Sequence, residues 1–141
     1  MTKCFRTQMR VPYSDTDAMK VVYHANYIKY FEMGRCEMLR EIGFPYALIE
    51  EKGFMMPVIS VSCEYKKPAF YDDLLEIRTT VLSYRGATIV CQYEIYRKNT
   101  EELLVTGKTQ LAFVGKDMKP VIIKRKYPAL YETMQSLEET E

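Results

Sequence analysis

Five stretches of this sequence alternate between apolar and polar residues with a period of two, and this pattern constrains the fold more than any other feature. The alternation is typical of β-strands that bury one face and leave the other in a wetter environment. The predicted strands cover residues 5–13, 59–66, 75–81, 88–95 and 105–113. Turn residues separate the last four strands by short links, which favours an antiparallel meander.

One long helix is predicted between the first two strands. Apolar residues recur at steps of three and four over residues 27–42, the spacing of a helix with one buried face. Asn26 is the predicted N-cap, and Gly43 before a Phe-Pro pair is the predicted stop. Gly34 lies within the apolar stripe, where glycine costs about 1 kcal/mol relative to alanine, a cost that is tolerated if a strand crosses closely there. A second, weaker helix is predicted at about residues 128–137.

The order of elements is therefore one strand, one helix and four further strands, in an α+β arrangement. One helix cannot cover both faces of five strands, but a strongly curved antiparallel sheet can wrap around it. The outer face and the free edges then favour a second subunit. This order resembles the layout of the hotdog fold. We expect one domain over residues 1–141, with a peripheral C-terminal extension from about residue 124 onward.

Composition excludes several classes of protein. With 48% apolar and 13% aromatic residues, the 141-residue chain can bury one core and is not intrinsically disordered. A formal net charge of +1 argues against a nucleic-acid-binding protein. No apolar run reaches the ~20 residues of a membrane helix, and the first residues lack a secretory signal, so a cytoplasmic protein is expected. Four cysteines and one histidine do not form a usual zinc site, and no metal is expected.

Candidate chemistry lies between the first strand and the helix. Asp15 and Asp17 stand two residues apart, just before the helix N-terminus. The free N–H groups and positive dipole end of a helix can bind an anion or stabilise an oxyanion on a carbonyl. A nearby carboxylate can act as general base on water or as nucleophile on an acyl carbon. The same pair also suits a turn and cap, or a hard cation, so the residues alone leave these alternatives open.

The same segment resembles the acyl-CoA thioesterases of the 4-hydroxybenzoyl-CoA thioesterase family, in particular its YbgC-like branch. The matching pieces are Asp15-Thr-Asp17-Ala, Val21-Val-Tyr-His-Ala-Asn-Tyr27 and, less specifically, residues 65–77 and 83–86. The resemblance covers roughly residues 5–120. It implies the hotdog fold and hydrolysis of acyl-CoA to a carboxylic acid and CoA, without a cofactor. It also implies a homodimer at least, with a homotetramer as the expected assembly.

The resemblance assigns roles to individual residues. Asp17 is the implied catalytic carboxylate, and the backbone N–H at or beside His24 is the implied oxyanion donor. The ring of His24 either packs or orients water or substrate. The implied substrate-binding residues are Tyr23, Tyr27 and Val61 for the acyl group, and Tyr84, Arg85 and Thr88 for CoA. The family commonly has glycine at the position of Lys20, where glycine would permit a positive φ.

Two alternative functions stay open on the sequence. A hotdog hydratase or dehydratase acting on CoA-bound or carrier-bound acyl groups would use His24 with an acid to move protons at carbons two and three. A non-catalytic acyl-CoA-binding subunit would hold the ligand without turnover. The sequence does not indicate the preferred acyl chain.

Overall fold

The computed structural model describes residues 3–138. The strands are β1 (Cys4–Arg10), β2 (Val58–Tyr65), β3 (Leu74–Arg85), β4 (Thr88–Arg97) and β5 (Glu102–Ala112). The helices are α1 (Asn26–Glu41), α2 (Tyr46–Glu51), α3 (Ile123–Lys126) and α4 (Pro128–Leu137), with a 3-10 turn, η1, at Tyr13–Asp15. The predicted order of strand, long helix and four strands is confirmed.

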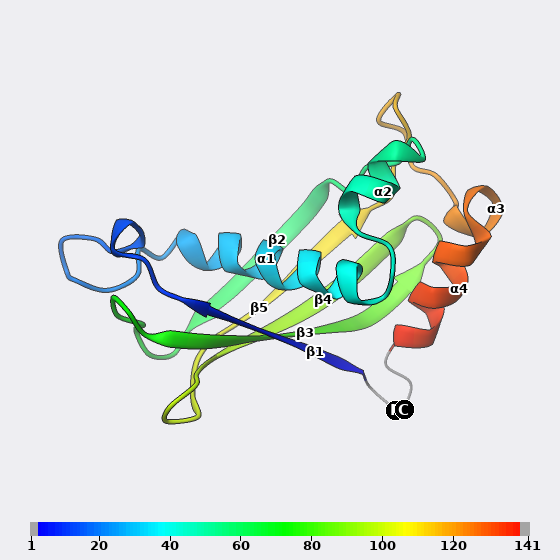
Figure 1. Cartoon of the computed structure of the whole chain (residues 1–141). Coiled ribbons are helices and arrows are strands. Elements are labelled where there is room, and N and C mark those ends of the chain that lie inside the picture. The colour runs from blue at the N-terminus through cyan, green and yellow to red at the C-terminus, as the bar shows by residue number, and fades with distance from the viewer. Residues whose placement is uncertain (1–2, 139–141) are drawn as a thin grey trace.

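All five strands form one antiparallel sheet in the order β1-β3-β4-β5-β2. The predicted meander is correct for β3, β4 and β5 and wrong for β2. Because β1 occupies the free edge of β3, β2 lies at the opposite edge of the sheet beside β5. Residues 66–73 make this crossing at the end of the sheet where the segment between β1 and α1 also lies (Figure 1).

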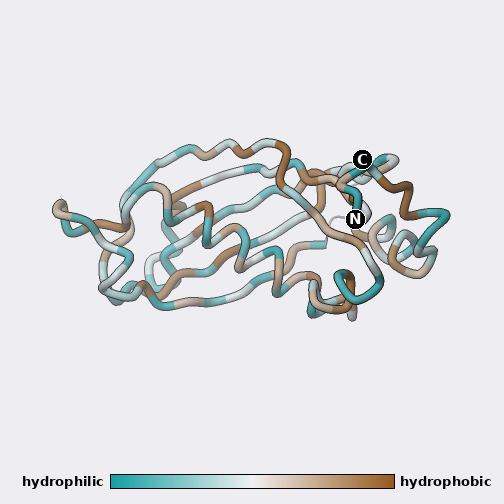
Figure 2. The backbone as a smooth tube through the Cα atoms, turned by 90° about the horizontal axis from the view of Figure 1, so that it is seen from above, coloured by the Kyte–Doolittle hydropathy of each residue, from teal (hydrophilic) through white to brown (hydrophobic). Residues whose placement is uncertain are grey.

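The sheet curves around α1, which runs lengthwise over its inner face (Figure 1 and Figure 2). The helix buries one stripe of large side chains against the strands: Tyr27, Tyr30, Phe31, Met38 and Leu39. Phe31 stacks on Tyr93 of β4 with ring centroids 4.6 Å apart. Burial of each such side chain stabilises the fold by about 1.5–3 kcal/mol, so this stripe anchors α1 in the concave face.

Two glycines let α1 approach the sheet closely. A Cβ placed on Gly34 would lie 2.6 Å from Thr79 Oγ1 and 2.7 Å from Ile77 Cγ2, both on β3. A Cβ on Gly107 of β5 would lie 2.3 Å from the ring of Phe31. These separations are shorter than van der Waals contact, and they confirm the predicted close crossing at Gly34.

The ends of the helices differ in part from the prediction. Asn26 is the first residue of α1 rather than its N-cap, and the N-cap position belongs to Ala25, whose side chain makes no capping hydrogen bond. The Asn26 side chain instead donates a hydrogen bond to the loop that precedes α1, as described below. The predicted C-terminal helix is present as α4, but Leu130 and Met134 are fully buried in the core. This segment is therefore less peripheral than its sequence suggests.

Strand β2 is an edge strand that the chain itself leaves largely uncovered. Period-two alternation predicts one buried face here, yet Ile59 is 55% exposed and Val61 is 39% exposed. Tyr65 at the end of the strand is also exposed. The predicted buried face is absent in the single chain, because α1 packs over β1, β3 and β4 at the other side of the sheet and does not cover these residues. An exposed apolar edge of this kind is typical of a surface that pairs with another chain.

Candidate active site

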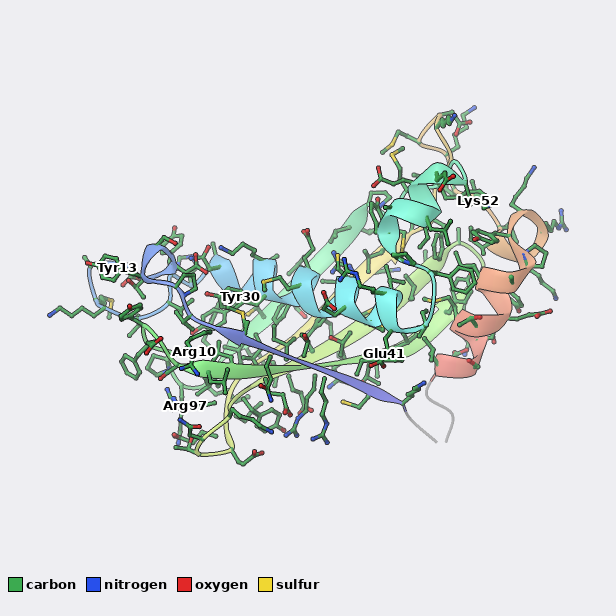
Figure 3. All side chains as sticks on the ribbon, in the orientation of Figure 1. Arg10, Tyr13, Tyr30, Glu41, Lys52 and Arg97 are labelled. Carbon is green, nitrogen blue, oxygen red and sulfur yellow. The ribbon has the colours of Figure 1, made fainter. Side chains whose placement is uncertain are left out.

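A buried carboxylate fixes the loop that connects β1 to α1. Asp15 is 6% exposed, and its carboxylate accepts hydrogen bonds from the Tyr30 hydroxyl (2.7 Å) and from Lys29 Nζ (2.9 Å). Its backbone carbonyl accepts the N–H of Tyr23 and a side-chain N–H of Asn26, both at 2.9 Å. Figure 3 shows Tyr30 near the start of α1, at the end of the molecule where this loop lies. Asp15 thus ties the loop to the beginning of the helix.

The partners of Asp15 also determine its charge. Burial raises the pKa of the Asp15 carboxyl, but the hydrogen bonds from Tyr30 and Lys29 outweigh burial and hold that pKa below its usual value. Burial also raises the pKa of the Tyr30 hydroxyl, which therefore stays protonated and donates. Asp15 is accordingly an anion whose two carboxylate oxygens are both occupied, which suits a residue that positions the loop.

Asp17 lies two residues further on, in a tight turn. Its N–H donates to the carbonyl of Val21 (3.0 Å), and its own carbonyl accepts the N–H of Lys20 (2.8 Å). Oδ1 of the half-buried carboxylate accepts the N–H of Met19 (2.8 Å), whereas Oδ2 accepts no hydrogen bond from residues 3–138. Lys20 adopts a φ of 67°, the conformation that the family's glycine would take at lower cost. The turn therefore keeps one carboxylate oxygen of Asp17 available.

The beginning of α1 leaves two backbone donors unused. The N–H groups of Asn26, Tyr27 and Ile28 each donate to the carbonyl three residues earlier. Those of His24 and Ala25 donate to no group in the part of the chain that the structure describes. They lie at the positive end of the helix dipole, where a negative oxygen is stabilised. The predicted oxyanion donor at or beside His24 requires a backbone N–H that has no acceptor within the chain, at the start of α1.

A groove of about 260 Å³ lies beside this helix end, between α1 and the end of β2. It is lined by Val21, Val22, His24, Tyr27, Tyr65, Lys66, Lys67 and Pro68. The exposed ring of His24 packs against Tyr23 with centroids 4.5 Å apart and meets the edge of Tyr65 at 6.2 Å. The Tyr65 hydroxyl donates to the backbone carbonyl of His24 (3.0 Å). Tyr27 is buried at the wall of the groove, and its hydroxyl accepts the N–H of Ala69 (3.2 Å).

The structure therefore brings together three of the predicted site residues, Tyr23, His24 and Tyr27. Asp17 belongs to the same loop but does not line the groove of the single chain. Tyr65 is a groove residue to which the sequence analysis gives no site role, although it lies in a predicted strand and begins the matching piece at residues 65–77. Its position beside α1 depends on β2 lying at the far edge of the sheet, and the local sequence carries no signal for that.

Two further predicted residues do not reach this groove. Val61 lies on the exposed β2 edge, outside the groove. Tyr84 is 1% exposed and packs against Phe113 and Tyr131, with centroids 5.8 and 5.6 Å away. Its buried hydroxyl has no hydrogen-bond partner among the described residues. The ring of Tyr84 is covered by α4 in this packing, so the predicted contact of Tyr84 with CoA gains no support from its side chain.

Arg85 and Thr88 form the turn between β3 and β4, at the other end of the sheet. The Arg85 side chain is 81% exposed and lies 3.5 Å from Glu138, just after α4. The Thr88 hydroxyl donates to the backbone carbonyl of Arg85 (3.0 Å). β3 spans about 36 Å at 3.3 Å per residue, so this turn lies at the opposite end of the sheet from the groove at His24.

The described residues contain no group of three histidine, cysteine, aspartate or glutamate side chains placed to hold a metal ion. Within the same residues, no helix is long and apolar enough to span a membrane.

Comparison with known proteins gives the family. Residues 11–129 match the thioesterase-like superfamily. The chain is 36% identical over 132 residues to the acyl-CoA thioesterase YbgC of Haemophilus influenzae, covering 93% of this chain and 96% of that protein. It is 31% identical over 123 residues to a putative acyl-CoA thioesterase, YneP, of Bacillus subtilis, covering 87% of this chain and 89% of that protein.

Among solved structures, the DHNA-CoA thioesterase of Staphylococcus aureus superposes with a TM-score of 0.91 at 33% identity, covering 95% of this chain and 90% of that one. This match confirms the predicted α+β hotdog fold, with its five-stranded antiparallel sheet curved around one central helix. The fold, the Asp-x-Asp loop before α1 and the extent of these matches lead to one conclusion: this chain belongs to the thioesterase-like superfamily.

Proposed function

We propose that this chain hydrolyses acyl-CoA thioesters to a carboxylic acid and free CoA. The observation that carries the proposal is the pair of unused backbone N–H groups of His24 and Ala25, beside the groove that His24 lines. Relatives named acyl-CoA thioesterases, similar over most of their length, support the same reaction.

The helix end stabilises the charge that develops during the reaction. When the thioester carbonyl is attacked, its oxygen becomes an oxyanion, and two backbone donors at a helix N-terminus are suited to bind it. The groove beside them is walled by aromatic rings and ends at Lys66 and Lys67. The rings provide apolar surface for the acyl group. Lys66 and Lys67 form ion pairs with Glu64 (3.2 Å) and Glu102 (2.9 Å).

Asp17 supplies the attack on the carbonyl. As a general base, it takes a proton from water, and the water oxygen bonds to the carbonyl carbon. The C–S bond then breaks, and CoA leaves as a thiolate that takes up a proton. As a nucleophile, Asp17 itself bonds to that carbon, the C–S bond breaks and CoA leaves as a thiolate that takes up a proton, and water then hydrolyses the resulting anhydride to the carboxylic acid and free Asp17. In both routes, the Met19 N–H holds Oδ1 and so keeps the Asp17 carboxylate in one orientation, and Oδ2 is free to react.

The active unit is a homodimer, and two such dimers form a homotetramer. The exposed β2 edge, with Ile59 and Val61, is the surface that pairs with a second copy. When two β2 edges pair across a two-fold axis, the two chains run in opposite directions. The Arg85–Thr88 turn of the partner subunit then lies at the same end of the assembly as Asp17. Contacts between CoA and this turn are therefore made by the second copy of the chain.

The test is release of free thiol from a panel of short, long, branched and aromatic acyl-CoAs. We expect the wild-type protein to release thiol and Asp17→Asn to lose about 10²–10⁴-fold in turnover, the contribution of a positioned base. Asparagine retains an oxygen that can accept the Met19 N–H, so the loop and the thermal unfolding midpoint should be preserved.

Asp117→Asn is the matched control. Asp117 also accepts the N–H two residues further on, at 3.0 Å, but in an exposed loop after β5. It should retain wild-type turnover. Undiminished hydrolysis by Asp17→Asn would remove the assignment of Asp17. Tight CoA binding without thiol release from any substrate would favour a binding subunit, and a change in double-bond absorbance would favour a hydratase.

A further inference from the structure

A buried arginine on α1 has no acidic partner. Arg35 is 9% exposed, and its Nη1 donates to the Tyr93 hydroxyl (3.0 Å), which shares a second hydrogen bond with Thr109 Oγ1 (2.6 Å). None of the ion pairs among residues 3–138 involves Arg35, although the chain forms such pairs at other buried acids. A guanidinium has five N–H donors, and buried charges are normally paired. Arg35 therefore has binding capacity that this chain does not use.

Arg35 lines a groove of about 310 Å³ between α1 and the start of β2. Much of its wall is apolar, from Leu39, Met56, Pro57 and Val58. The exposed Glu32 also lines it, but it forms no ion pair with Arg35. At about 30 Å³ for each water-sized group, the groove accommodates roughly ten non-hydrogen atoms. It suits a small acyl chain with a polar end.

The groove at Arg35 and the groove at His24 lie along the same seam between α1 and β2. Arg35 follows Tyr27 by about 12 Å along the helix, at 1.5 Å per residue. Val58 at the start of β2 lines the first groove, and Tyr65 at its end lines the second. When two copies pair through antiparallel β2 edges, the start of one β2 lies beside the end of the other. Each Arg35 groove is then next to the His24 groove of the other subunit.

We propose that the Arg35 groove receives the far end of the acyl group and selects acyl groups that carry a carboxylate there. This inference rests on the proposed hydrolase and on its β2-paired dimer. A carboxylate accepts two parallel hydrogen bonds from a guanidinium, and the apolar wall strengthens this contact by excluding water. The Tyr93 hydroxyl holds the guanidinium in place, so Tyr93 is a positioning residue.

The experiment compares adipoyl-CoA with hexanoyl-CoA, whose acyl chains are equally long and differ by the terminal carboxylate. The measured quantity is the ratio of kcat/KM for adipoyl-CoA to that for hexanoyl-CoA. We expect Arg35→Met to lower this ratio at least tenfold. Arg35→Lys retains the positive charge but not the paired N–H donors of a guanidinium, and it should give an intermediate ratio. Arg40→Met, at an exposed arginine on the same helix that pairs with Glu37, is the control and should retain the wild-type ratio.

A second readout separates this inference from the proposed reaction. The Kd values of both acyl-CoAs are measured by calorimetry in the Asp17→Asn background, with and without Arg35→Met, and Arg35→Gln replaces Arg35→Met if that protein does not fold. Loss of preference for adipoyl-CoA in binding supports the inference even if no substrate is hydrolysed. Equal losses for both substrates, or a monomeric Arg35→Met protein, would overturn it. The first result would show that Arg35 only supports the fold, and the second that it binds a carboxylate of the partner subunit.

Discussion

Gly34→Ala tests whether the distance between α1 and the sheet is fixed by packing, because two effects of this change have opposite signs. Helix propensity alone favours alanine over glycine by about 1 kcal/mol in the interior of a helix. The new methyl group, however, would lie 2.6 Å from Thr79 Oγ1 and 2.7 Å from Ile77 Cγ2. The sign of the change in unfolding free energy therefore shows which effect is larger.

We expect packing to be the larger effect. Thr79 and Ile77 are β-branched and stiff at χ1, and both are fully buried on β3, so neither can move away at low cost. Overpacking of a core costs about 1–3 kcal/mol, and two simultaneous contacts place this site toward the upper part of that range. After subtraction of the propensity gain, Gly34→Ala should destabilise the protein by about 1–2 kcal/mol.

The assay is equilibrium unfolding in urea followed by circular dichroism, at one protein concentration so that any assembly contributes equally. Thr79→Ala, which removes the nearest atom, is combined with Gly34→Ala in a double-mutant cycle. Because Thr79 Oγ1 has no hydrogen-bond partner among the described residues, Thr79→Ala loses no hydrogen bond, and the cycle subtracts the cost of its lost packing. The pair should couple favourably by about 1 kcal/mol. A Gly34→Ala protein more stable than wild type would refute the reasoning.

Two further predictions concern the edge strand and the loop. Val61→Lys places a charge on the exposed β2 edge and should shift the assembly toward monomers in analytical ultracentrifugation. An unchanged dimer dissociation constant would show that the interface lies elsewhere. Asp15→Asn should lower the unfolding free energy by about 1–3 kcal/mol at pH 7, because the buried acceptor of Lys29 and Tyr30 loses its charge. The folded-state pKa of Asp15 is depressed, so its contribution is present above its unfolded pKa, about 3.9, and is lost as pH falls below it. Urea titrations at pH 7 and pH 3.5 check this, and an equal difference at both values would contradict it.

The elements that the sequence predicts well are those that local pattern determines. Residues alternate in β3, β4 and β5 because each strand has one face against α1 and the core, and this requires no knowledge of its neighbours. The stripe from Tyr27 to Leu39 predicts α1 for the same reason. Gly34 is also informative locally, because a glycine inside such a stripe requires a close contact to compensate its cost.

The elements that the sequence does not predict depend on strand order and on assembly. β2 has the alternation of a half-buried strand, but its place at the sheet edge leaves Ile59 and Val61 exposed in one chain. Tyr84 lies in a motif that resembles a CoA-binding turn, yet α4 covers its ring. Asp15 and Asp17 are identical in type and two residues apart, and only the positions of Lys29 and Tyr30 show that the first is buried and paired.

Buried charged side chains near the two edges of the sheet differ in whether the chain gives them a partner of opposite charge. Near the β1 edge, the buried Glu76 is within ion-pair distance of Arg6, Arg78 and Lys98. Near the β2 edge, Arg35 has no acid and the N–H groups of His24 and Ala25 have no acceptor within the described chain. Unsatisfied groups of this kind are costly unless something else occupies them. Arg35 and the His24 and Ala25 N–H groups lie on the side where the apolar β2 edge is also exposed, which argues that substrate and second subunit bind there together. A monomeric protein that contains Asp17 and His24 but lacks the paired edge should therefore lose both turnover and acyl selectivity.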